Sequence, residues 1–342
     1  MFDKILNLQL FAVLSNGANA TVASGSMGTG AVNADLSPEN KTYYDMTLID
    51  EAQAQLVHDQ FGQKKPIPAG GGKTIEFRKF HSYEKALTPL QEGVTPAGKA
   101  VKVTAITSTV DQYGDYTMLT DVLDLTSIDN VVLETTKIHG RQAGMTLDTV
   151  TRDVLHSGTN VTYCGDGTSR KTLTADDQLT VDVIMQVVAK LRSMNAPTIN
   201  GKYVAIIHPY VAYDLMRDPE WIDAHKYTNV TNLYEGEIGE IAGVRFVQTS
   251  EAKIYTGDSC PSGLAVFGTL FLADGAYGVT EITGGGLQTI VKQKGSAGTA
   301  DPLDQRSTVG WKAIKTAEIL IQDYIVRVES CSKKFSATAA AN

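Results

Sequence analysis

Histidine and acidic side chains are the residues of this sequence whose type and spacing could hold a metal. The six histidines are His58, His81, His139, His156, His208 and His225. No HxxxH or HExxH pair places two of them on one helical face, as a zinc site on a helix would need. Two acidic groups, Asp176–Asp177 and Glu235, Glu237 and Glu240, could bind a cation, but the spaced oxygen ligands of a calcium loop are absent. We therefore predict no metal site, and expect solvated acidic faces instead.

Two histidines have a structural explanation from their neighbours. His208 precedes Pro209 at an expected strand-to-helix turn, where a side chain that caps or packs the helix is common. His139 stands beside Arg141 on a long expected helix, and we expect it to be solvated or to lie at an interface. Neither position indicates catalysis.

The glycine-rich segment Ala69–Thr74 (AGGGKT) resembles the end of a phosphate-binding loop. The GxxxxGK[ST] pattern would place its first glycine at Ile67, and the segment precedes a strand where phosphate binding needs a helix N-terminus. Gly25, Gly28 and Gly30 do not match GxGxxG, and no GxSxG nucleophile elbow occurs. We predict a flexible hinge at 69–74, no cofactor, no catalytic residue and no enzymatic activity.

The three cysteines, Cys164, Cys260 and Cys331, are odd in number and widely spaced. Without a CxxC pair they indicate neither a zinc site nor a disulfide framework. A reducing cytoplasm is the simplest compartment for such a chain.

Composition and charge restrict the class of protein further. The chain has 342 residues, of which 42% are hydrophobic and 20% charged, and these values are typical of a folded chain with a sizeable core. Its net charge of -8 and the lack of a long basic run disfavour a sequence-specific DNA binder, although a container for DNA need not bind it tightly. No apolar stretch reaches the ~18 residues of a membrane span.

The N-terminus has some features of a secretory leader. Residues 5–14 are apolar and Ala18–Ala20 imitates a cleavage site, but Asn7 and Gln9 interrupt the apolar run and Asp3 lies where a basic region belongs. We do not predict a leader. A secreted adhesin with a cleaved leader is therefore an alternative that an intact N-terminus would exclude.

The expected helices and strands indicate an α+β chain with an unusual order of segments. Residues 41–61 have helical spacing of apolar residues, and 128–157 form the longest helical segment, a candidate structural spine with a stripe that includes Ile138 and Met145. Gly140 and Gly144 in that helix indicate a bend or close packing against another backbone. We expect these segments: a polar arm at 1–40, a helix leading into a loop at 41–64, an extended β-hairpin loop at 65–120, the spine-helix region at 121–174, an α+β unit at 175–300, return strands at 301–331 and a small polar tail at 332–342.

Within this plan, several elements have specific signals. Residues 73–80 and 101–110 are rich in β-formers, so we expect a long hairpin, which is marginally stable alone and needs a neighbouring surface. Thr180 is expected to cap a helix through about Met194. We also expect a strand over Tyr203–Ile207, a helix from Pro209, and strands near 245–248, 264–271 and 287–293. Residues 308–330 are expected to form two strands, or one bent strand, that return to the spine.

The order of parts resembles the tailed-phage capsid fold of the Hong Kong 97 type. Local sequence is similar too. Asn7–Ala12 (NLQLFA) looks like the opening of many phage capsid proteins, and Leu90–Pro96 (LQEGVTP) and Gln112–Tyr116 (QYGDY) look like the extended-loop segment of that fold. Gly236–Phe246 (GEIGEIAGVRF) with Thr249–Glu251, together with Val309–Lys312 (VGWK), is similar to the major capsid family typified by the N-four podophage. The resemblance covers essentially the whole chain. It implies a peripheral domain that holds the spine helix and the C-terminal strands, and an axial domain near 175–300. No catalytic residue carries over from the family.

The resemblance implies a major capsid protein that self-assembles as hexamers and pentamers into an icosahedral shell around phage double-stranded DNA. It would be assembled in the host cytoplasm and located in the virion capsid. Because no scaffold-like helical segment of ~100 residues precedes the arm, we expect a separate scaffolding protein, together with a portal and an optional decoration protein. Covalent cross-linking through Lys73, Lys79 or Lys99 is not predicted, because no acceptor and catalytic acid can be paired with them. The alternatives are an encapsulin-like nanocompartment shell that packages a cargo protein and, less favoured, an enzyme of unknown type.

Overall fold

The computed structural model describes residues 46–342 apart from 53–55, 69, 81–82, 84, 90–91, 94, 96–97, 128–129, 226–238, 282, 284 and 297–300. The expected arm at 1–40 lies outside the described residues. The chain divides into two compact units. The first contains residues up to Leu56, Gln112–Leu147 and Gly285–Ile314, and the second contains Val57–Asp111, Asp148–Gly284 and Lys315–Asn342.

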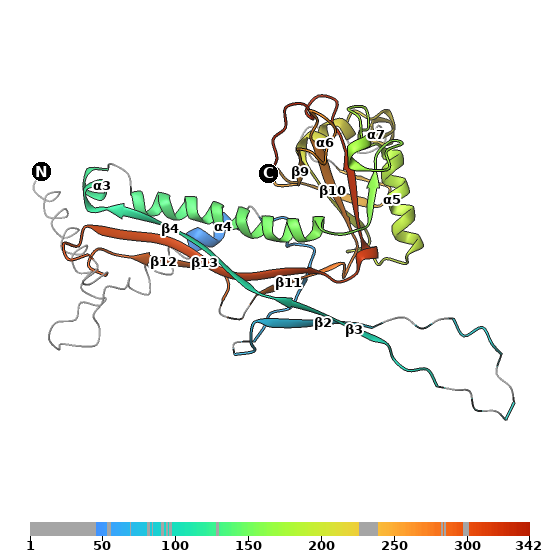
Figure 1. Ribbon diagram of the computed structural model, residues 1–342, viewed down its shortest axis with the longest axis horizontal. Coiled ribbons are helices and arrows are strands. Elements are labelled where there is room, and N and C mark those ends of the chain that lie inside the picture. The colour runs from blue at the N-terminus through green and yellow to red at the C-terminus, as the bar shows by residue number, and fades with distance from the viewer. Residues whose placement is uncertain are drawn as a thin grey trace, which may run out of the picture. The chain divides into compact units, whose positions relative to one another are not determined.

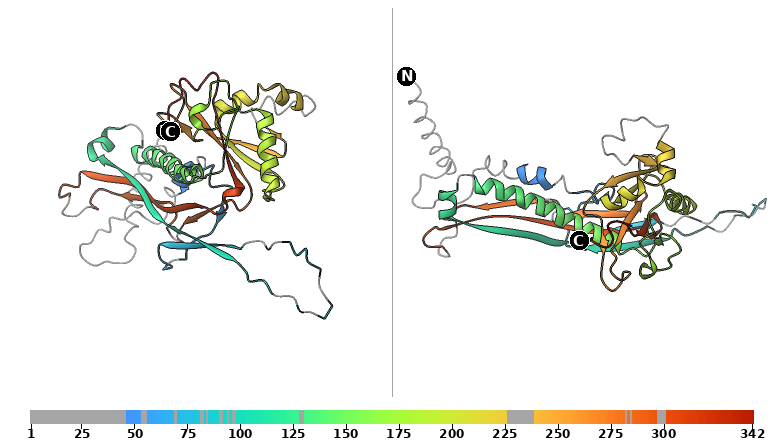
Figure 2. Two further views of the ribbon diagram at one scale, coloured as in Figure 1. Left: turned by 45° about the vertical axis from the view of Figure 1, so that its right-hand side comes forward. Right: turned by 90° about the horizontal axis from the view of Figure 1, so that it is seen from above.

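The first unit packs helices on strands. It contains most of β4 (Asp111–Thr120), α3 (Asp121–Thr126), the first part of α4 (Val131–His156), β12 (Gln288–Lys292) and the first part of β13 (Arg306–Ile319). β12 and β4 both pair with β13. α4 lies along these strands (Figures 1 and 2). The core between them consists of Leu48, Ala143, Leu147, Trp311 and Ala313.

The long helix α4 confirms the predicted spine within the described residues. Gly140 lies inside it because the chain at Leu48 comes very close. A Cβ at Gly140 would lie 2.8 Å from the Leu48 carbonyl oxygen and 2.9 Å from Cβ of Glu51. Of the two explanations for this glycine, close packing against another backbone is therefore the right one.

The helix predicted over 41–61 is wrong in its second half. Residues 46–52 are helical, but the chain from Leu56 onward is not. The backbone N–H groups of Val57 and His58 donate to Oδ1 of Asp148, at 2.9 and 2.8 Å, in place of helical carbonyls. The helix that the apolar spacing predicts therefore ends early, because Asp148, about 90 residues away in the sequence, accepts the N–H groups that a longer helix would use.

The second unit includes a two-stranded ribbon and a small sheet. β2 (Thr74–Phe80) and β3 (Val103–Thr109) pair antiparallel from Thr74↔Thr109 to Phe80↔Val103, which confirms the predicted hairpin. β1 (Gln63–Lys64) pairs parallel with β11 (Tyr277–Glu281), and β11 pairs antiparallel with the last part of β13. β11 was not predicted.

The larger sheet of the second unit has seven strands in the order β5–β14–β10–β6–β8–β7, with β9 paired to β10. Its strands are β5 (Val161–Tyr163), β6 (Tyr203–Ile207), β7 (Glu240–Ile241), β8 (Val244–Gln248), β9 (Ile254–Tyr255), β10 (Val266–Leu272) and β14 (Ile325–Ser330). The helices of this part are α5 (Val181–Ser193), α6 (Pro209–Leu215) and α7 (Pro219–His225), with short 3-10 turns at Arg170–Thr172 and Gln322–Tyr324. Figure 1 shows α5 and α6 beside the strands.

Both faces of this sheet are covered, which explains why β6 is buried at every position. Tyr203, Ala205 and Ile207 pack in a core with α5 and α6, whereas Ile206 joins a second core with Leu155 of α4. Alternate residues of a strand point to opposite faces, so a continuous apolar strand indicates a sheet buried on both sides. No helix among the described residues is both long and apolar enough to cross a membrane.

Local sequence signals are confirmed in this region. Thr180 caps α5 by accepting from the Val183 N–H, and Asp182 and Lys190 lie at the helix ends that favour their charges. His208 caps α6, with its ring Nδ1 3.1 Å from the Tyr210 N–H that donates to it.

The C-terminal segment forms two strands, as predicted. β14 pairs with β10 and β5, and it also contacts the end of the spine helix: Ile325 shares a core with Leu155, and the Arg327 guanidinium donates to the His156 carbonyl oxygen. The expected polar tail at 332–342 is docked onto the second unit. Ser332 and Ser336 are buried, the Ala265 N–H donates to the Ser336 carbonyl at 2.7 Å, and Phe335 stacks on Tyr210 with ring centroids 4.2 Å apart. Small polar residues can pair with backbone groups in an interior, as the Ser336 hydroxyl does by accepting from the Ser332 N–H at 2.7 Å.

Candidate interaction surface

The groups that could have performed chemistry are occupied in structural roles. His139 is buried, not solvated, with its ring nitrogens 3.1 Å from Oε1 of Gln142 and 3.0 Å from Oγ1 of Thr117. In the second unit, Nδ1 of His58 lies 2.6 Å from Oδ2 of Asp148 in a fully buried pair. Neither histidine opens onto a pocket that the structure describes.

The acidic groups also lack the form of a metal site. Asp176 pairs with Lys333 at 2.8 Å, and Oδ2 of Asp177 accepts from the N–H of Thr174 at 2.7 Å. Glu240 forms an ion pair with Lys202, while Glu235 and Glu237 lie outside the described residues. Across the described part of the chain, no group of three or more His, Cys, Asp or Glu side chains could hold a metal ion.

The three cysteines are buried and free. Burial raises the pKa of the Cys331 thiol to about 11, and the pKa of Cys164 is raised even further by burial. Both thiols are therefore protonated at neutral pH and are poor nucleophiles.

The glycines at 70–72 form a turn that enters a strand. Gly70 and Gly72 have φ of 83° and 87°, and the Gly71 N–H donates to the Pro68 carbonyl at 2.9 Å. The strand β2 follows directly, so the helix N-terminus of a phosphate-binding loop is absent here. The glycines supply the left-handed backbone that this turn requires.

The hairpin itself has one covered face and one free face. Ile75 and Phe77 are buried, and their cross-strand partners Ser108 and Ile106 lie on the same face. Glu76 and Arg78 point the other way and pair with each other at 2.9 Å while remaining exposed. The strict alternation explains how a β-ribbon with only two strands stays in register.

Beyond the ribbon, the described residues of the loop from 81 to 102 extend away from the sheets of the second unit (Figures 1 and 2). Its described residues are all exposed, including the large apolar side chains of Tyr83, Leu87 and Val101. A hairpin with apolar, uncovered residues is only marginally stable in water. The loop therefore has the features of a surface that binds a partner molecule.

The root of the ribbon is held by a close contact with β11. Phe77 lies against Gly278, where an added Cβ would be 2.7 Å from the Phe77 ring. Oγ of Ser108 lies 3.1 Å from Oγ1 of Thr316, and the Lys65 ammonium lies 5.5 Å from the Phe77 ring centroid. These contacts hold the root of the ribbon in place within the second unit.

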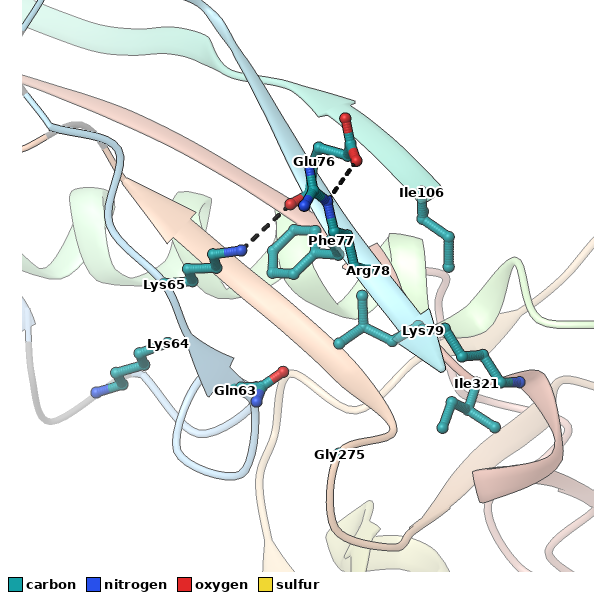
Figure 3. A pocket seen from close by; sticks show the side chains of 11 residues that line it. Gln63, Lys64, Lys65, Glu76, Phe77, Arg78, Lys79, Ile106, Gly275 and Ile321 are labelled. Atoms are coloured by element: carbon teal, nitrogen blue, oxygen red, sulfur yellow. Dashed lines mark hydrogen bonds and ion pairs between the residues drawn. The ribbon is translucent and has the colours of Figure 1, made fainter. Parts of the chain in front are cut away.

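A cleft of about 740 Å³ opens beside this root. Figure 3 shows it between the β1 segment and β2, with the side chain of Lys65 reaching the Glu76 carbonyl oxygen at 3.2 Å. The residues that line it are Gln63, Lys64, Lys65, Glu76, Phe77, Arg78, Lys79, Ile106, Gly275, Leu320 and Ile321. Four cations against one carboxylate give this lining a net charge of +3, on a chain whose net charge is -8. We call it the cationic cleft. No sequence pattern indicates this cleft, because its walls come from five separate segments of the chain.

The spine helix leaves part of its predicted apolar stripe exposed, although Leu147 and Leu155 of the same stripe are buried. The predicted stripe is exposed at Ile138 (64%) and Met145 (39%), while Thr136 and His139 are buried. Apolar residues on one helix face with nothing over them are typical of a surface that binds a partner.

The helix α3, which was not predicted, is the second such place in the first unit. It begins where Oγ1 of Thr120 accepts from the Leu123 N–H, and none of its residues is buried. Val122, Leu123 and Leu125 are exposed at 62%, 44% and 81%. The weak sequence signal was the Thr cap followed by Asp121 in the first turn.

Comparisons with known proteins agree with these features. The family model described as "Phage capsid protein" matches residues 103–324, well over half of the 342-residue chain. A search of curated proteins gives no match.

Solved structures share the fold at low sequence identity. The capsid of Cyanophage Pam1 has a TM-score of 0.66 at 13% identity and covers 91% of this chain and 100% of its own. The capsid of Ralstonia phage GP4 has a TM-score of 0.64 at 14% identity, with 92% and 98% covered. A virus-like particle from Pyrococcus furiosus matches less well, with a TM-score of 0.50 at 10% identity over 85% and 99%. The fold is therefore that of shell subunits, as the sequence resemblance predicted.

Proposed function

The chain belongs to the phage capsid protein family as a shell-forming major capsid protein, and we propose that its copies form hexamers and pentamers that close into an icosahedral shell around double-stranded DNA. The observation that supports this proposal most strongly is the hairpin. Its root is packed in the second unit, but its loop is exposed at every described position and carries large apolar side chains. Such a loop gains burial on a neighbouring copy, and many modest contacts of this kind add up to a stable closed shell.

The proposed organisation follows the family resemblance. Residues 1–40 act as an arm, 65–120 as the extended loop, and 175–300 as an axial domain, with the spine helix in a peripheral domain. Residues 301–331 supply the return strands of that peripheral domain, and the contact of Ile325 with Leu155 at the end of the spine helix supports this assignment.

The partners we propose are a portal, a scaffolding protein and, optionally, a decoration protein. Assembly takes place in the host cytoplasm. The DNA is enclosed without sequence-specific binding, since a net charge of -8 provides no general attraction for phosphates.

The nanocompartment alternative uses a similar fold, so the fold alone does not separate the two functions. The family match to phage capsid proteins favours the phage shell. Genes for a portal and a terminase beside this gene would agree with that choice, whereas a neighbouring gene for a cargo enzyme would contradict it.

Negative-stain microscopy of the expressed chain tests the proposal directly. The full chain, expressed with its genomic neighbours, should form shells, hexamers or tubes. Deletion of residues 81–100 should leave a folded subunit, seen by an unchanged circular dichroism spectrum per residue, that does not assemble. Normal shells from the deletion variant would contradict the role of the hairpin, and a full chain that stays monomeric and turns over a substrate would contradict the capsid function.

A further inference from the structure

The cationic cleft is the most distinctive surface of the second unit that the hairpin does not explain. It combines positive charge from Lys64, Lys65, Arg78 and Lys79 with an apolar wall that includes Phe77, Ile106 and Ile321. A ligand that matches both features must present carboxylates or phosphates next to apolar groups. Simple anions would leave the apolar wall uncovered.

The lysines of the cleft are available for such a ligand. Lys64 and Lys79 form no ion pair with any residue in the described part of the chain, and Arg78 forms only an exposed pair with Glu76. Exposed ion pairs contribute about 0–1 kcal/mol, so this pair can be exchanged for another at little cost. The positive charge of the cleft is therefore not neutralised by its own unit.

The helix α3 of the first unit has the complementary composition. It presents Asp121 and Asp124 beside the exposed side chains of Val122 and Leu125, and it contains no basic residue. Its six residues are about 9 Å long at ~1.5 Å per residue, a length that a cleft of about 740 Å³ can accept. Asp124 is paired with Lys294 at 2.9 Å, but that pair is exposed, and Asp121 has no cation partner among the described residues.

Other exposed apolar segments fit less well. The hairpin loop carries Tyr83 and Leu87 beside Lys85, so its charge has the wrong sign. α7 carries Glu220 and the exposed Ile222, but it already buries Trp221 in the second unit. α3 is distinguished because it buries none of its own residues.

We propose that α3 of one copy docks into the cationic cleft of a second copy, with Asp121 and Asp124 against Lys64 and Lys79, and Val122 and Leu125 against the apolar wall. This inference rests on the proposed shell function and names one of its contacts. The two surfaces differ, so the contact is heterologous, and each copy can give its α3 to one neighbour and receive α3 from another. Heterologous contacts that close on themselves generate rings, which is the arrangement a shell needs.

Complementary charge reversal tests the contact. One variant carries Lys64→Glu and Lys79→Glu, and the other carries Asp121→Lys and Asp124→Lys. Each alone places like charges in the contact, so we expect the assembled fraction, measured by sedimentation and light scattering, to fall at least tenfold. A control with Lys171→Glu and Lys190→Glu makes the same charge change as the cleft variant but lies outside the cleft, and it should assemble normally.

Mixing the two reversed variants gives the decisive result. The normal α3 of the first fits the normal cleft of the second, and the reversed α3 of the second fits the reversed cleft of the first, so the mixture should recover assembly. Circular dichroism of each variant before mixing confirms that it is folded. Recovery would require a contact between copies, because neither chain alone contains a matched pair.

The other outcomes separate this contact from the shell function. If the wild-type chain forms shells and both variants do so equally well, the contact is wrong and the shell function stands. If the cleft variant assembles but its shells retain less DNA, the cleft faces nucleic acid and the proposal is overturned. If two folded variants fail to assemble alone and also fail when mixed, α3 and the cleft are not partners. A wild-type chain that never assembles would contradict the proposed function itself.

Discussion

Asp148 shows how a single buried carboxylate can determine the path of the chain into the hairpin. It accepts from the backbone N–H groups of Val57 and His58 and lies 2.6 Å from Nδ1 of His58, and both side chains are fully buried. The segment that follows is fixed further by an ion pair between Lys315 and Asp59 and by the Thr151 hydroxyl, which donates to Asp59 at 2.6 Å. These bonds hold the residues that precede β1 and the cationic cleft.

Replacement of Asp148 should therefore destabilise the second unit strongly. Asp148→Ala leaves two buried N–H donors and a histidine without their acceptor, and we expect it to lower the free energy of unfolding by about 3–5 kcal/mol. Asp148→Asn keeps one acceptor oxygen and should lie between wild type and Asp148→Ala. Urea denaturation followed by circular dichroism measures both. A loss below about 1 kcal/mol for Asp148→Ala would show that solvent or a neighbouring group replaces the carboxylate.

Because His208 caps α6 in its neutral form, the stability of the fold should depend on pH. Burial lowers the pKa of His208 to about 4, from an ordinary value near 6.5, and its neutral Nδ1 accepts from the Tyr210 N–H. The unfolded chain then binds a proton at a higher pH than the folded chain does. The stability associated with His208 is present above pH ~6.5 and is lost as the pH falls towards about 4. Burial also lowers the pKa of His156, so His156 acts in the same direction.

We expect the free energy of unfolding to fall between pH 7 and pH 4, and to fall less steeply in His208→Asn. Asparagine can still cap the helix but does not titrate. Denaturation at several pH values, with wild type as reference, measures the difference in slope. Equal slopes would mean that His208 takes up its proton without losing its place in the fold.

At the scale of elements, the hairpin depends on a glycine in the strand beneath it. The Phe77 ring occupies the space where a side chain at position 278 would lie. Gly278→Ala should displace Phe77 and loosen the root of the ribbon, at a cost of about 1–3 kcal/mol. Limited proteolysis should then cut within residues 81–102 faster than in wild type. Gly98→Ala is the matched control, because an added Cβ there meets nothing within 4 Å.

The spine helix offers a second test in which two effects oppose each other. Alanine is favoured over glycine in a helix by up to about 1 kcal/mol, so Gly140→Ala should stabilise an isolated α4. In the folded chain the new Cβ would lie 2.8 Å from the backbone oxygen of Leu48, which cannot move as a side chain can. We expect the clash to dominate, with a lower thermal unfolding temperature. An unchanged or higher temperature would mean that the helix at 46–52 can shift away.

Much of the second unit could be predicted because its elements have local signals. Thr180 and His208 are capping residues that predict the helices after them, and the apolar run Tyr203–Ile207 predicts a strand buried on both faces. The family resemblance, carried by short motifs in a set order, indicated the fold and the function that the family match supports.

What could not be predicted depends on partners distant in the sequence. The early end of the first helix follows from Asp148, and the docked tail follows from pairing such as Ser336 with Ala265. The predicted stripe is exposed at Ile138 and Met145 but buried at Leu147 and Leu155, because apolar spacing alone does not say which part of a helix its own chain covers. α3 is short, and the cationic cleft forms only where five segments of the folded chain meet, so neither could be predicted from a sequence pattern.

At the scale of the whole molecule, the chain is acidic overall, but the lining of the cationic cleft is basic. A chain of net charge -8 repels other copies of itself at long range, and salt screens this repulsion over about 8–10 Å at physiological ionic strength. Local attraction at a cleft of charge +3 can act within that distance. Specific contacts can therefore form between copies that do not attract one another in general, which favours ordered over indiscriminate association.

The same net charge predicts that the subunit leaves DNA free. Non-specific binding to duplex DNA requires several cations that displace condensed counterions, and proteins with such surfaces bind with Kd of about 10⁻⁴–10⁻⁶ M at physiological salt. We expect the purified subunit to bind a fluorescently labelled duplex more weakly than this at 0.15 M salt, as measured by anisotropy. Micromolar binding that weakens steeply with salt would show that basic side chains gather on a DNA-facing surface, and the shell would then hold its DNA by direct contact and not merely by enclosure.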